Sequence, residues 1–367
     1  MTSQTGRARI SPQQLGAALA LSTGLLVVNL LPNPGLPVAD DDAPGLDAHV
    51  YLAMAESPLT FTRAPYAYRL GVPLVVHWLP FPHETSFLAL TLGGLLLTMV
   101  LGYTFFRVIG FDHVLGLLGV TFLGTAPEIP IYLGNHFLVD PLALTSIALL
   151  LLAIERGLDD GPMALLLLVS TLIKESAFFV VPVLYLRLSG AKVLDLRAAW
   201  RTVAVSIPAI VAALILRFWW VPDLVLFPYL TPWSVDRDPW FGSMESYQAL
   251  WRGLFSYLAL LAVANAFDTN WRLFARRYSP YALLVAAQLI VPMNQERLFY
   301  FAFPVVVSLA LVEFERLRYE LPQWAPLLIT ILVFCYLFVP DQPAYPIAIV
   351  ILGRLLIERR RTREESL

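Results

Sequence analysis

Long apolar runs follow one another along most of the chain, separated by short polar segments. A run of roughly 20 residues can cross a membrane as a helix, and a shorter run can cross when tilted or enter and return. The pattern therefore predicts an all-α, polytopic transmembrane bundle of about 10–12 spans. The runs are 13–31, 84–106, 114–131, 141–154, 162–173, 176–186, 202–221, 249–267, 280–293, 298–314, 322–339 and 344–357.

Two segments between the first and second runs have a different pattern. GLDAHVYLAMAE (45–56) places apolar residues on one side of a helix, and Asp47 and Tyr51, four residues apart, on another. It predicts an amphipathic interfacial helix in the first outer loop. YAYRLGVPLVVHWLPF (66–81) is interrupted by prolines and predicts an interfacial or re-entrant helix.

Composition supports a membrane protein. The chain is 58% hydrophobic and 14% charged, whereas a soluble domain is about a quarter charged. We expect a single integral-membrane domain over 1–367 with no soluble domain, and a net charge of −2 predicts no nucleic-acid partner. The single cysteine, Cys335, excludes an intramolecular disulfide and a cysteine-based metal cluster. The first run lacks a small-x-small cleavage site, so we expect it to be retained.

Positive charge predicts the orientation. With a cytoplasmic N-terminus and every run crossing, the basic residues gather on the inside, as the positive-inside rule requires. This holds only if 162–186 is a hairpin with Lys174 and Glu175 at its outer tip. Both termini are then cytoplasmic, and the protein belongs in the plasma (inner) membrane. All but seven of the 25 lysines and arginines lie inside, the seven being Arg63, Arg69, Lys174, Arg217, Arg237, Arg252 and Arg297.

The unusual polar residues fall mostly on the outer side. A polar layer on one face of a helical bundle predicts a site at that membrane–water boundary. The outer residues are Asp40, Asp41, Asp42, Asp47, His49, Arg63, Arg69, Glu128, Asn135, His136, Asp140, Lys174, Glu175, Asp236, Arg237, Asp238, Glu296 and Arg297.

Asp47 has two interpretations. It forms with Tyr51 the wet face of an interfacial helix, or it is a carboxylate that accepts a proton from an incoming hydroxyl or holds a divalent ion. The triplet Asp40–Asp42 is more simply explained as a solvated turn than as a metal cluster. In TRAPYAYRLGVP, Arg63, Tyr66, Tyr68 and Arg69 either anchor the chain at the interface or bind an anion, because arginine matches phosphate oxygens.

Three acidic or basic residues lie at the outer end of the third run or just after it. Glu128 and His136 either decorate a loop or form a weak metal-binding pair. Asp140 precedes Pro141, which predicts a helix start with Asp140 as the N-cap and the proline at the first helical position.

Lys174 and Glu175 are costly in lipid and are functional candidates by default. The alternative is a self-neutralising pair that ends a hairpin. Adjacent residues on a helix point apart, so either the helix breaks there or each charge finds another partner. Glu296 and Arg297 repeat the pattern. Lys174 and Arg297 are candidates to bind a phosphate or diphosphate, with the two glutamates orienting them.

These features together resemble the GT-C superfamily of integral-membrane glycosyltransferases, including the protein mannosyltransferase and aminoarabinose transferase types. The residues that carry the resemblance are Asp47 in GLDAHVYLAMAE, Arg69 in YRLGVP and the apolar hairpin around LIKE (172–175). The likeness covers roughly 13–220, and 221–367 would be C-terminal transmembrane helices.

The resemblance implies an inverting transfer from a polyprenyl-phosphate sugar to an acceptor hydroxyl on the outer face. Asp47 would be the catalytic base, and Arg69 and Lys174 would contact the donor phosphate. Where the family often pairs two acids, Asp47 is followed by Ala48 and His49, which leaves a divalent cation (Mg or Mn, held by Asp47 and Glu128) open. Acceptor recognition would fall to loops such as 228–241. The remaining predicted site residues are Arg297, Tyr51 and Tyr68 for binding and His49, Glu128, Asp140, Glu175 and Glu296 for support.

Two other functions remain open. A transporter or flippase for a lipid-linked or anionic solute also buries charges, although such proteins usually show internal symmetry, and none is evident here. A non-catalytic subunit of envelope assembly would share the same composition.

Overall fold

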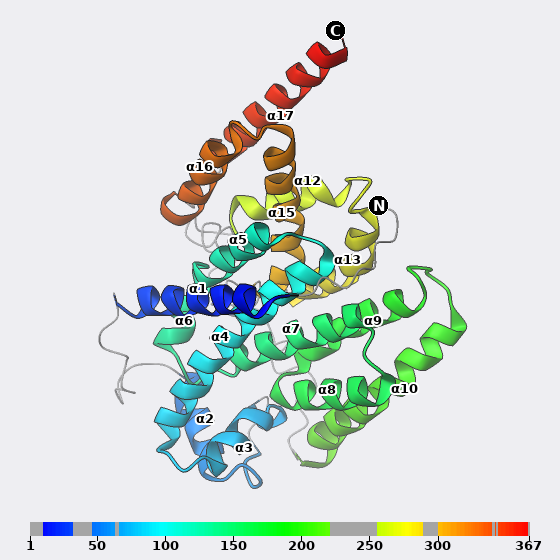
Figure 1. The fold of residues 1–367 in the computed structure, drawn as a ribbon. Coiled ribbons are helices and arrows are strands. Elements are labelled where there is room, and N and C mark those ends of the chain that lie inside the picture. Colours follow the sequence, from blue (N-terminus) through cyan, green and yellow to red (C-terminus); the bar gives the residue numbers. More distant parts are fainter. Residues whose placement is uncertain are drawn as a thin grey trace, which may run out of the picture.

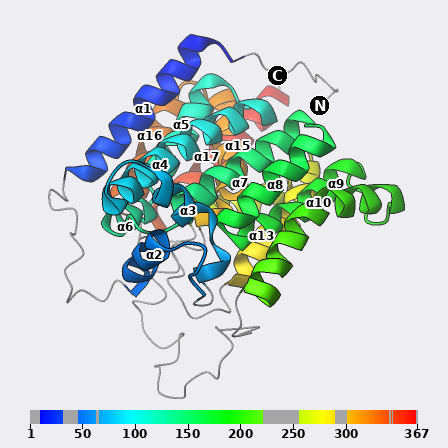
Figure 2. The same cartoon turned by 90° about the horizontal axis from the view of Figure 1, so that it is seen from below.

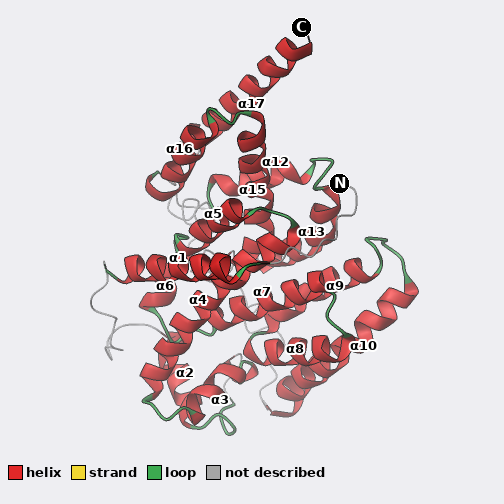
Figure 3. Ribbon diagram, viewed as in Figure 1, coloured by secondary structure: helices red, strands yellow, loops and turns green. Residues whose placement is uncertain are grey.

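The computed structural model describes residues 10–31, 46–62, 66–220, 255–288, 300–339, 342 and 344–365. Within these ranges all regular structure is helical, which confirms the all-α prediction (Figures 1 and 3). Helices from the first and second halves of the chain share one large apolar core, in which Phe106, Phe122 and Tyr300 are fully buried.

The first half begins with a capped helix. Ser11 and Gln14 exchange side-chain-to-backbone hydrogen bonds at the start of α1 (Pro12–Leu30), so the sequence specifies where this helix begins. It packs on α4 (His83–Ile109) and α5 (His113–Gly124).

The two segments between the first two predicted runs are helical, as expected. They form α2 (Leu46–Glu56), the short turn η1 (Tyr66–Tyr68) and α3 (Gly71–Trp78). The helices α2 and α3 pack on each other and lie together at one edge of the molecule, beside the start of α4 (Figures 1 and 2).

Three described helices are long and apolar enough to cross a membrane, namely α1, α4 and the continuous stretch Leu196–Trp220. A fourth is counted if α5 and α6 (Glu128–Gly134), which meet at 51°, are one bent span. Several other predicted runs form shorter helices, among them Asp160–Ile173, Tyr257–Ala266 and Ala325–Phe338. The number of spans, predicted from the apolar runs as about 10–12, stays a prediction.

The predicted hairpin at 162–186 is present. Ion pairs join Lys174 to Asp140 and Arg187 to Glu155, so the segment after Lys174 runs parallel to α7. The helix before Lys174 runs the opposite way, and the chain reverses at this residue. The elements are α7 (Asp140–Arg156), α8 (Asp160–Ile173), η2 (Glu175–Val180), α9 (Val181–Leu188), α10 (Leu196–Ile215) and η3 (Leu216–Trp220).

The second half packs against the first through buried hydrogen bonds as well as apolar contacts. The hydroxyl of Tyr300 donates to the carbonyl of Leu123, and that of Tyr336 donates to the carbonyl of Phe122. Within the second half, Asn265 donates to the carbonyl of Leu309. The elements are α12 (Tyr257–Ala266), α13 (Arg272–Ala287), η5 (Tyr300–Ala302), α15 (Phe303–Glu320), α16 (Ala325–Phe338) and α17 (Ala344–Glu365).

Polar residues gather at both ends of the α7–α10 group. We call the region around Asp140, Lys174 and Glu175 the Lys174 end, and the region around Glu155 and Asp160 the Glu155 end. The Lys174 end also receives η1 and the start of α3, while the Glu155 end receives the start of α13 through Arg277.

Candidate functional site

The backbone breaks at Lys174. The helix α8 ends at Ile173, Lys174 is extended with φ −160° and ψ 137°, and a tight turn begins at Glu175. Neighbouring charges on a helix would point apart. Both outcomes expected from the sequence occur, because the helix breaks and each charge finds a partner elsewhere.

Lys174 pairs with Asp140 deep in the protein. The two side chains are 4% and 1% exposed, and Nζ lies 2.5 Å from Oδ1. The ammonium also lies 4.9 Å from the centre of the Phe301 ring. Desolvation makes a lone buried charge very unfavourable, so this ammonium requires a carboxylate.

The predicted role of Asp140 as an N-cap is wrong. The helix α7 begins at Asp140 itself, and Val139 occupies the cap position. Pro141 lies at the second helical position, one later than the sequence predicts. Asp140 therefore serves a tertiary ion pair with a residue 34 positions away, which local sequence rules do not detect.

Arg69 holds Glu175 with a fork of two hydrogen bonds. Nε donates to Oε2 at 3.3 Å, Nη2 donates to Oε1 at 3.0 Å, and Nη1 donates to the Tyr51 hydroxyl at 3.2 Å. Such bidentate pairs are strong and fix both side chains. Glu175 lies at the reversal, outside the three candidate spans. Burial acts to raise the pKa of Glu175, but the charges of Arg69 and Lys174 outweigh it and lower the pKa to about 2.

A glycine brings Arg69 to this position. A Cβ added to Gly71 would lie 3.0 Å from the carbonyl carbon and oxygen of Leu172, so α3 starts directly against the backbone at the end of α8. Only a residue without a side chain permits this approach. The close contact explains how η1, distant in sequence, reaches the hairpin tip.

The helix α2 lies against the same cluster through Tyr51. Tyr51 is 1% exposed and meets Tyr66 edge to face at 5.4 Å between ring centres. Asp47 lies one turn before Tyr51 in α2, and its side chain is outside the described part of the structure. His49 is exposed on this helix. The catalytic role of Asp47 stays a prediction that its place in α2 makes testable.

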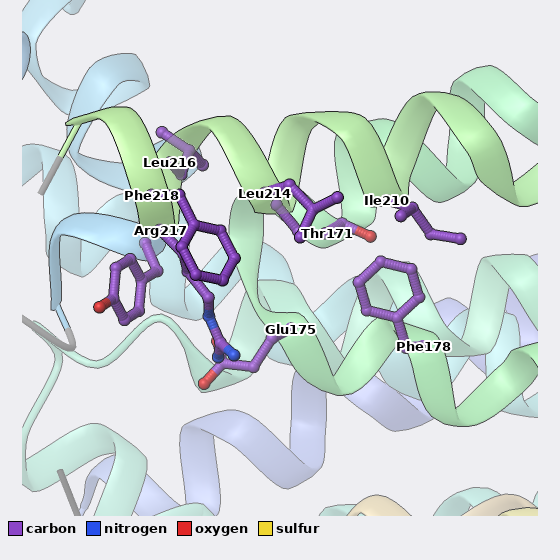
Figure 4. A pocket seen from close by; sticks show the side chains of 10 residues that line it. Thr171, Glu175, Phe178, Ile210, Leu214, Leu216, Arg217 and Phe218 are labelled. Carbon is purple, nitrogen blue, oxygen red and sulfur yellow. The ribbon is translucent and has the colours of Figure 1, made fainter. Parts of the chain in front are cut away.

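An apolar cavity of about 450 Å³ adjoins the ion pairs (Figure 4). The polar ends of Arg217 and Glu175 lie at one end of it, and Ile210 and Phe178 lie toward the other. Its described lining comes from η1, the α8–η2 reversal, the last turns of α10 and η3. It consists of Tyr68, Thr171, Glu175, Phe178, Ile210, Ala213, Leu214, Leu216, Arg217 and Phe218.

Arg217 and Phe301 were not selected as site residues from the sequence. The guanidinium carbon of Arg217 lies 5.0 Å from the centre of the Tyr68 ring, which is a cation–π contact. The sequence did point to Arg217, because an arginine inside the apolar run 202–221 is costly in lipid. Phe301 carried no comparable signal.

Glu128 and His136 do not decorate a loop, because both are buried, at 0% and 6% exposure. Glu128 begins α6 and is close enough to Tyr300 and Tyr336 for its charge to act on them. Burial lowers the pKa of His136, and the charge of Glu84 partly offsets this.

Other predicted residues lie outside the described ranges. Their proposed roles in anion binding and acceptor recognition stay predictions. They are Asp40, Asp41, Asp42, Arg63, Asp236, Arg237, Asp238, Glu296, Arg297 and the loop 228–241.

A divalent-cation site does not fit the side chains that the structure describes. No group of three or more histidine, cysteine, aspartate or glutamate residues converges among them. The acids at the Lys174 end are already engaged, Asp140 by Lys174 and Glu175 by Arg69.

No protein-family model matches this chain, and no curated protein matches its sequence. The functional conclusion therefore rests on the geometry of the Lys174 end.

Proposed function

We propose that this chain is an integral-membrane glycosyltransferase of the GT-C type, acting at the Lys174 end. It moves a sugar from a polyprenyl-phosphate donor to an acceptor hydroxyl. One observation carries the proposal: α2 with Asp47, the Arg69 fork and the hairpin tip converge beside an apolar cavity. A lipid-linked sugar needs such a neighbourhood, with fixed charges for its phosphate and an apolar space for its chain.

The proposed topology is polytopic in the plasma (inner) membrane, with the Lys174 end outside. The Glu155 end is cytoplasmic together with both termini, since it holds Arg187, Arg201 and Arg277, as the positive-inside rule expects. The α8–α9 hairpin then presents its tip to the outer boundary, where a lipid tail stays in the bilayer and a polar acceptor arrives from water.

The chemistry requires little beyond positioning and charge. The acceptor oxygen attacks the anomeric carbon from the face opposite the phosphate and inverts it. The bond from this carbon to the phosphate oxygen breaks, and its electron pair leaves with the polyprenyl phosphate. The acceptor proton passes to the Asp47 carboxylate. Cations already held in place, as Arg69 is by Glu175 and Tyr51, stabilise the departing phosphate without reorganising.

The position of the site favours an enzyme over a transporter. Transporters bind their substrates near the bilayer midplane, between related halves of the protein. Here the ion pairs lie where helices begin or end, namely at the start of α7, the end of α8 and just before α3.

The test is sugar transfer by purified protein in liposomes supplied with a panel of labelled polyprenyl-phosphate sugars. Asp47→Asn should lower the rate by about 10²–10⁴-fold, the usual contribution of a general base. Glu56→Gln is the matched control, because Glu56 is an exposed carboxylate on the same helix, and it should leave the rate unchanged.

Transfer that survives Asp47→Asn would place the base elsewhere. Absence of transfer from every donor, together with lipid movement between leaflets, would support the flippase instead. Absence of both activities would favour a subunit without catalysis.

A further inference from the structure

Two of the cations predicted to bind phosphate, Arg69 and Lys174, are already paired with carboxylates. Arg69 is paired with Glu175 and Lys174 with Asp140, so these ion pairs carry no net charge. A neutral set of dipoles attracts an anion less than an uncompensated cation does. A phosphate arriving at the Lys174 end therefore needs a further positive charge.

Arg217 supplies that charge. Its guanidinium rests on the Tyr68 ring and makes no hydrogen bond or ion pair with any described residue. An aromatic face holds a guanidinium in place while leaving its N–H donors available for oxygen atoms. Arg217 also lies in a π-helical stretch, Leu216–Trp220, a geometry frequent at functional sites.

The cavity beside Arg217 suits a hydrocarbon chain. It holds about 450 Å³, and its walls are mostly apolar. Among the described lining residues Glu175 is the one acid, and Arg69 holds it, so the described groups around Arg217 carry a net positive charge. Figure 4 shows Arg217 and Glu175 at the same end of the cavity. Phe218 and Trp219 follow Arg217 and are 56% and 86% exposed. Exposed aromatic residues at a span end are typical of the headgroup level of a bilayer.

We propose that Arg217 binds the phosphate of a lipid whose hydrocarbon chain enters this cavity. In naming that lipid as the polyprenyl-phosphate donor, the inference rests on the proposed function. Arg69 and Lys174 then remain paired beside the phosphate as fixed dipoles, and Arg217 carries the net attraction. The recognised chemistry is a phosphate attached to an apolar chain.

The test is equilibrium binding of labelled polyprenyl phosphate to the full chain in phosphatidylcholine nanodiscs. Arg217→Gln should weaken binding by about tenfold or more, because charge-assisted hydrogen bonds to phosphate are lost. Arg217→Lys should retain part of the affinity, since the charge remains without the planar fork. Arg201→Gln, at the opposite end of α10, is the matched control and should bind as wild type does.

Two further measurements distinguish the contribution of the lipid's hydrocarbon chain from that of its phosphate. Ala213→Phe places a ring in the cavity and should weaken binding, while polyprenol without phosphate should bind about tenfold or more weakly to wild type. Inorganic phosphate at millimolar concentration should not displace the lipid. Size-exclusion profiles and melting temperatures identify any variant that fails to fold, and Arg217→Lys then replaces Arg217→Gln as the deciding variant.

Equal binding by wild type and the deciding Arg217 variant would overturn the inference, and so would polyprenol binding as tightly as its phosphate. Displacement by inorganic phosphate without any effect of Ala213→Phe would also overturn it and identify free phosphate as the ligand. The readout is binding, so Arg217-dependent binding without sugar transfer sustains this inference and counts only against the proposed enzyme.

Discussion

The two ends of the α7–α10 group use charge differently. At the Glu155 end one carboxylate serves several partners, because Glu155 accepts from Arg277 and Tyr278 and lies 4.0 Å from Arg187. At the Lys174 end the described ion pairs join Arg69 to Glu175 and Lys174 to Asp140, and a cavity and Arg217 lie beside them. Shared carboxylates join several helices and stabilise the bundle, whereas the ion pairs at the Lys174 end lie beside a cavity that has room for a ligand.

Carboxylates that pair with more than one arginine also occur in the second half of the chain. Glu313 is 0% exposed and pairs with both Arg316 and Arg354, which ties α15 to α17. Arg316 also pairs with Asp268, between α12 and α13. We therefore expect changes at this network to affect folding alone, and changes at the Lys174 end to affect binding as well.

The largest effect is expected at the buried pair of the Lys174 end. Lys174→Met should lower the free energy of unfolding by about 3–5 kcal/mol, because it leaves a carboxylate buried alone. The double variant with Asp140→Leu should recover most of that loss, since an apolar pair can replace a buried ion pair. Unfolding of the purified protein measures stability, and polyprenyl-phosphate binding should stay impaired in both. A loss below about 1 kcal/mol would mean that the pair behaves as an exposed one.

Glu313→Gln tests the same comparison from the side of the Glu313 ion-pair network. It should cost about 3 kcal/mol, because two arginines lose their shared carboxylate in a buried setting. Lipid binding by the folded fraction should equal that of wild type. Weakened binding at unchanged stability would contradict the division of roles between the two regions.

A smaller effect is expected at the close approach of α3 to α8. Gly71→Ala should cost about 1–3 kcal/mol through overpacking and should weaken binding, because Arg69 moves with η1. Gly93→Ala is the control, since a Cβ there meets nothing within 4 Å. It should be neutral or slightly stabilising, as alanine favours helix over glycine. Similar melting temperatures for both variants would refute the steric account.

The smallest effect is expected at the exposed pair of the Glu155 end. Arg201 and Asp160 are 51% and 50% exposed at 2.8 Å. Arg201→Gln should change stability by less than about 1 kcal/mol, because water screens such pairs. A thermal melt beside Lys174→Met compares the two extremes under the same conditions.

The sequence revealed the helical fold and the reversal at Lys174, because costly charges within apolar runs are few and informative. It also selected Arg69, Lys174 and Glu175, which the structure brings together. It did not reveal which residues form each ion pair. The partner of Lys174 depends on how α7 packs against the hairpin, and local rules made Asp140 a helix cap.

Arg217 shows the same limit in another form. Its residue type was visible, but its value to the site depends on the Tyr68 ring beneath it and on the pairing of the neighbouring cations. Such facts arise only from tertiary packing. The close approach at Gly71 is likewise invisible until α3 and α8 are placed side by side.

The length of α8 has a consequence for the surrounding lipid. Its 14 residues rise about 21 Å, which is less than a hydrocarbon core of roughly 30 Å. If α8 crosses as in the proposed topology, a crossing this short would tilt little and would instead thin the bilayer around it. In the proposed topology the outer leaflet would bend inward around the hairpin, and the phosphates of nearby lipids would lie at the level of Lys174. The protein would then meet its lipid by lowering the membrane surface to the site instead of lifting the lipid out.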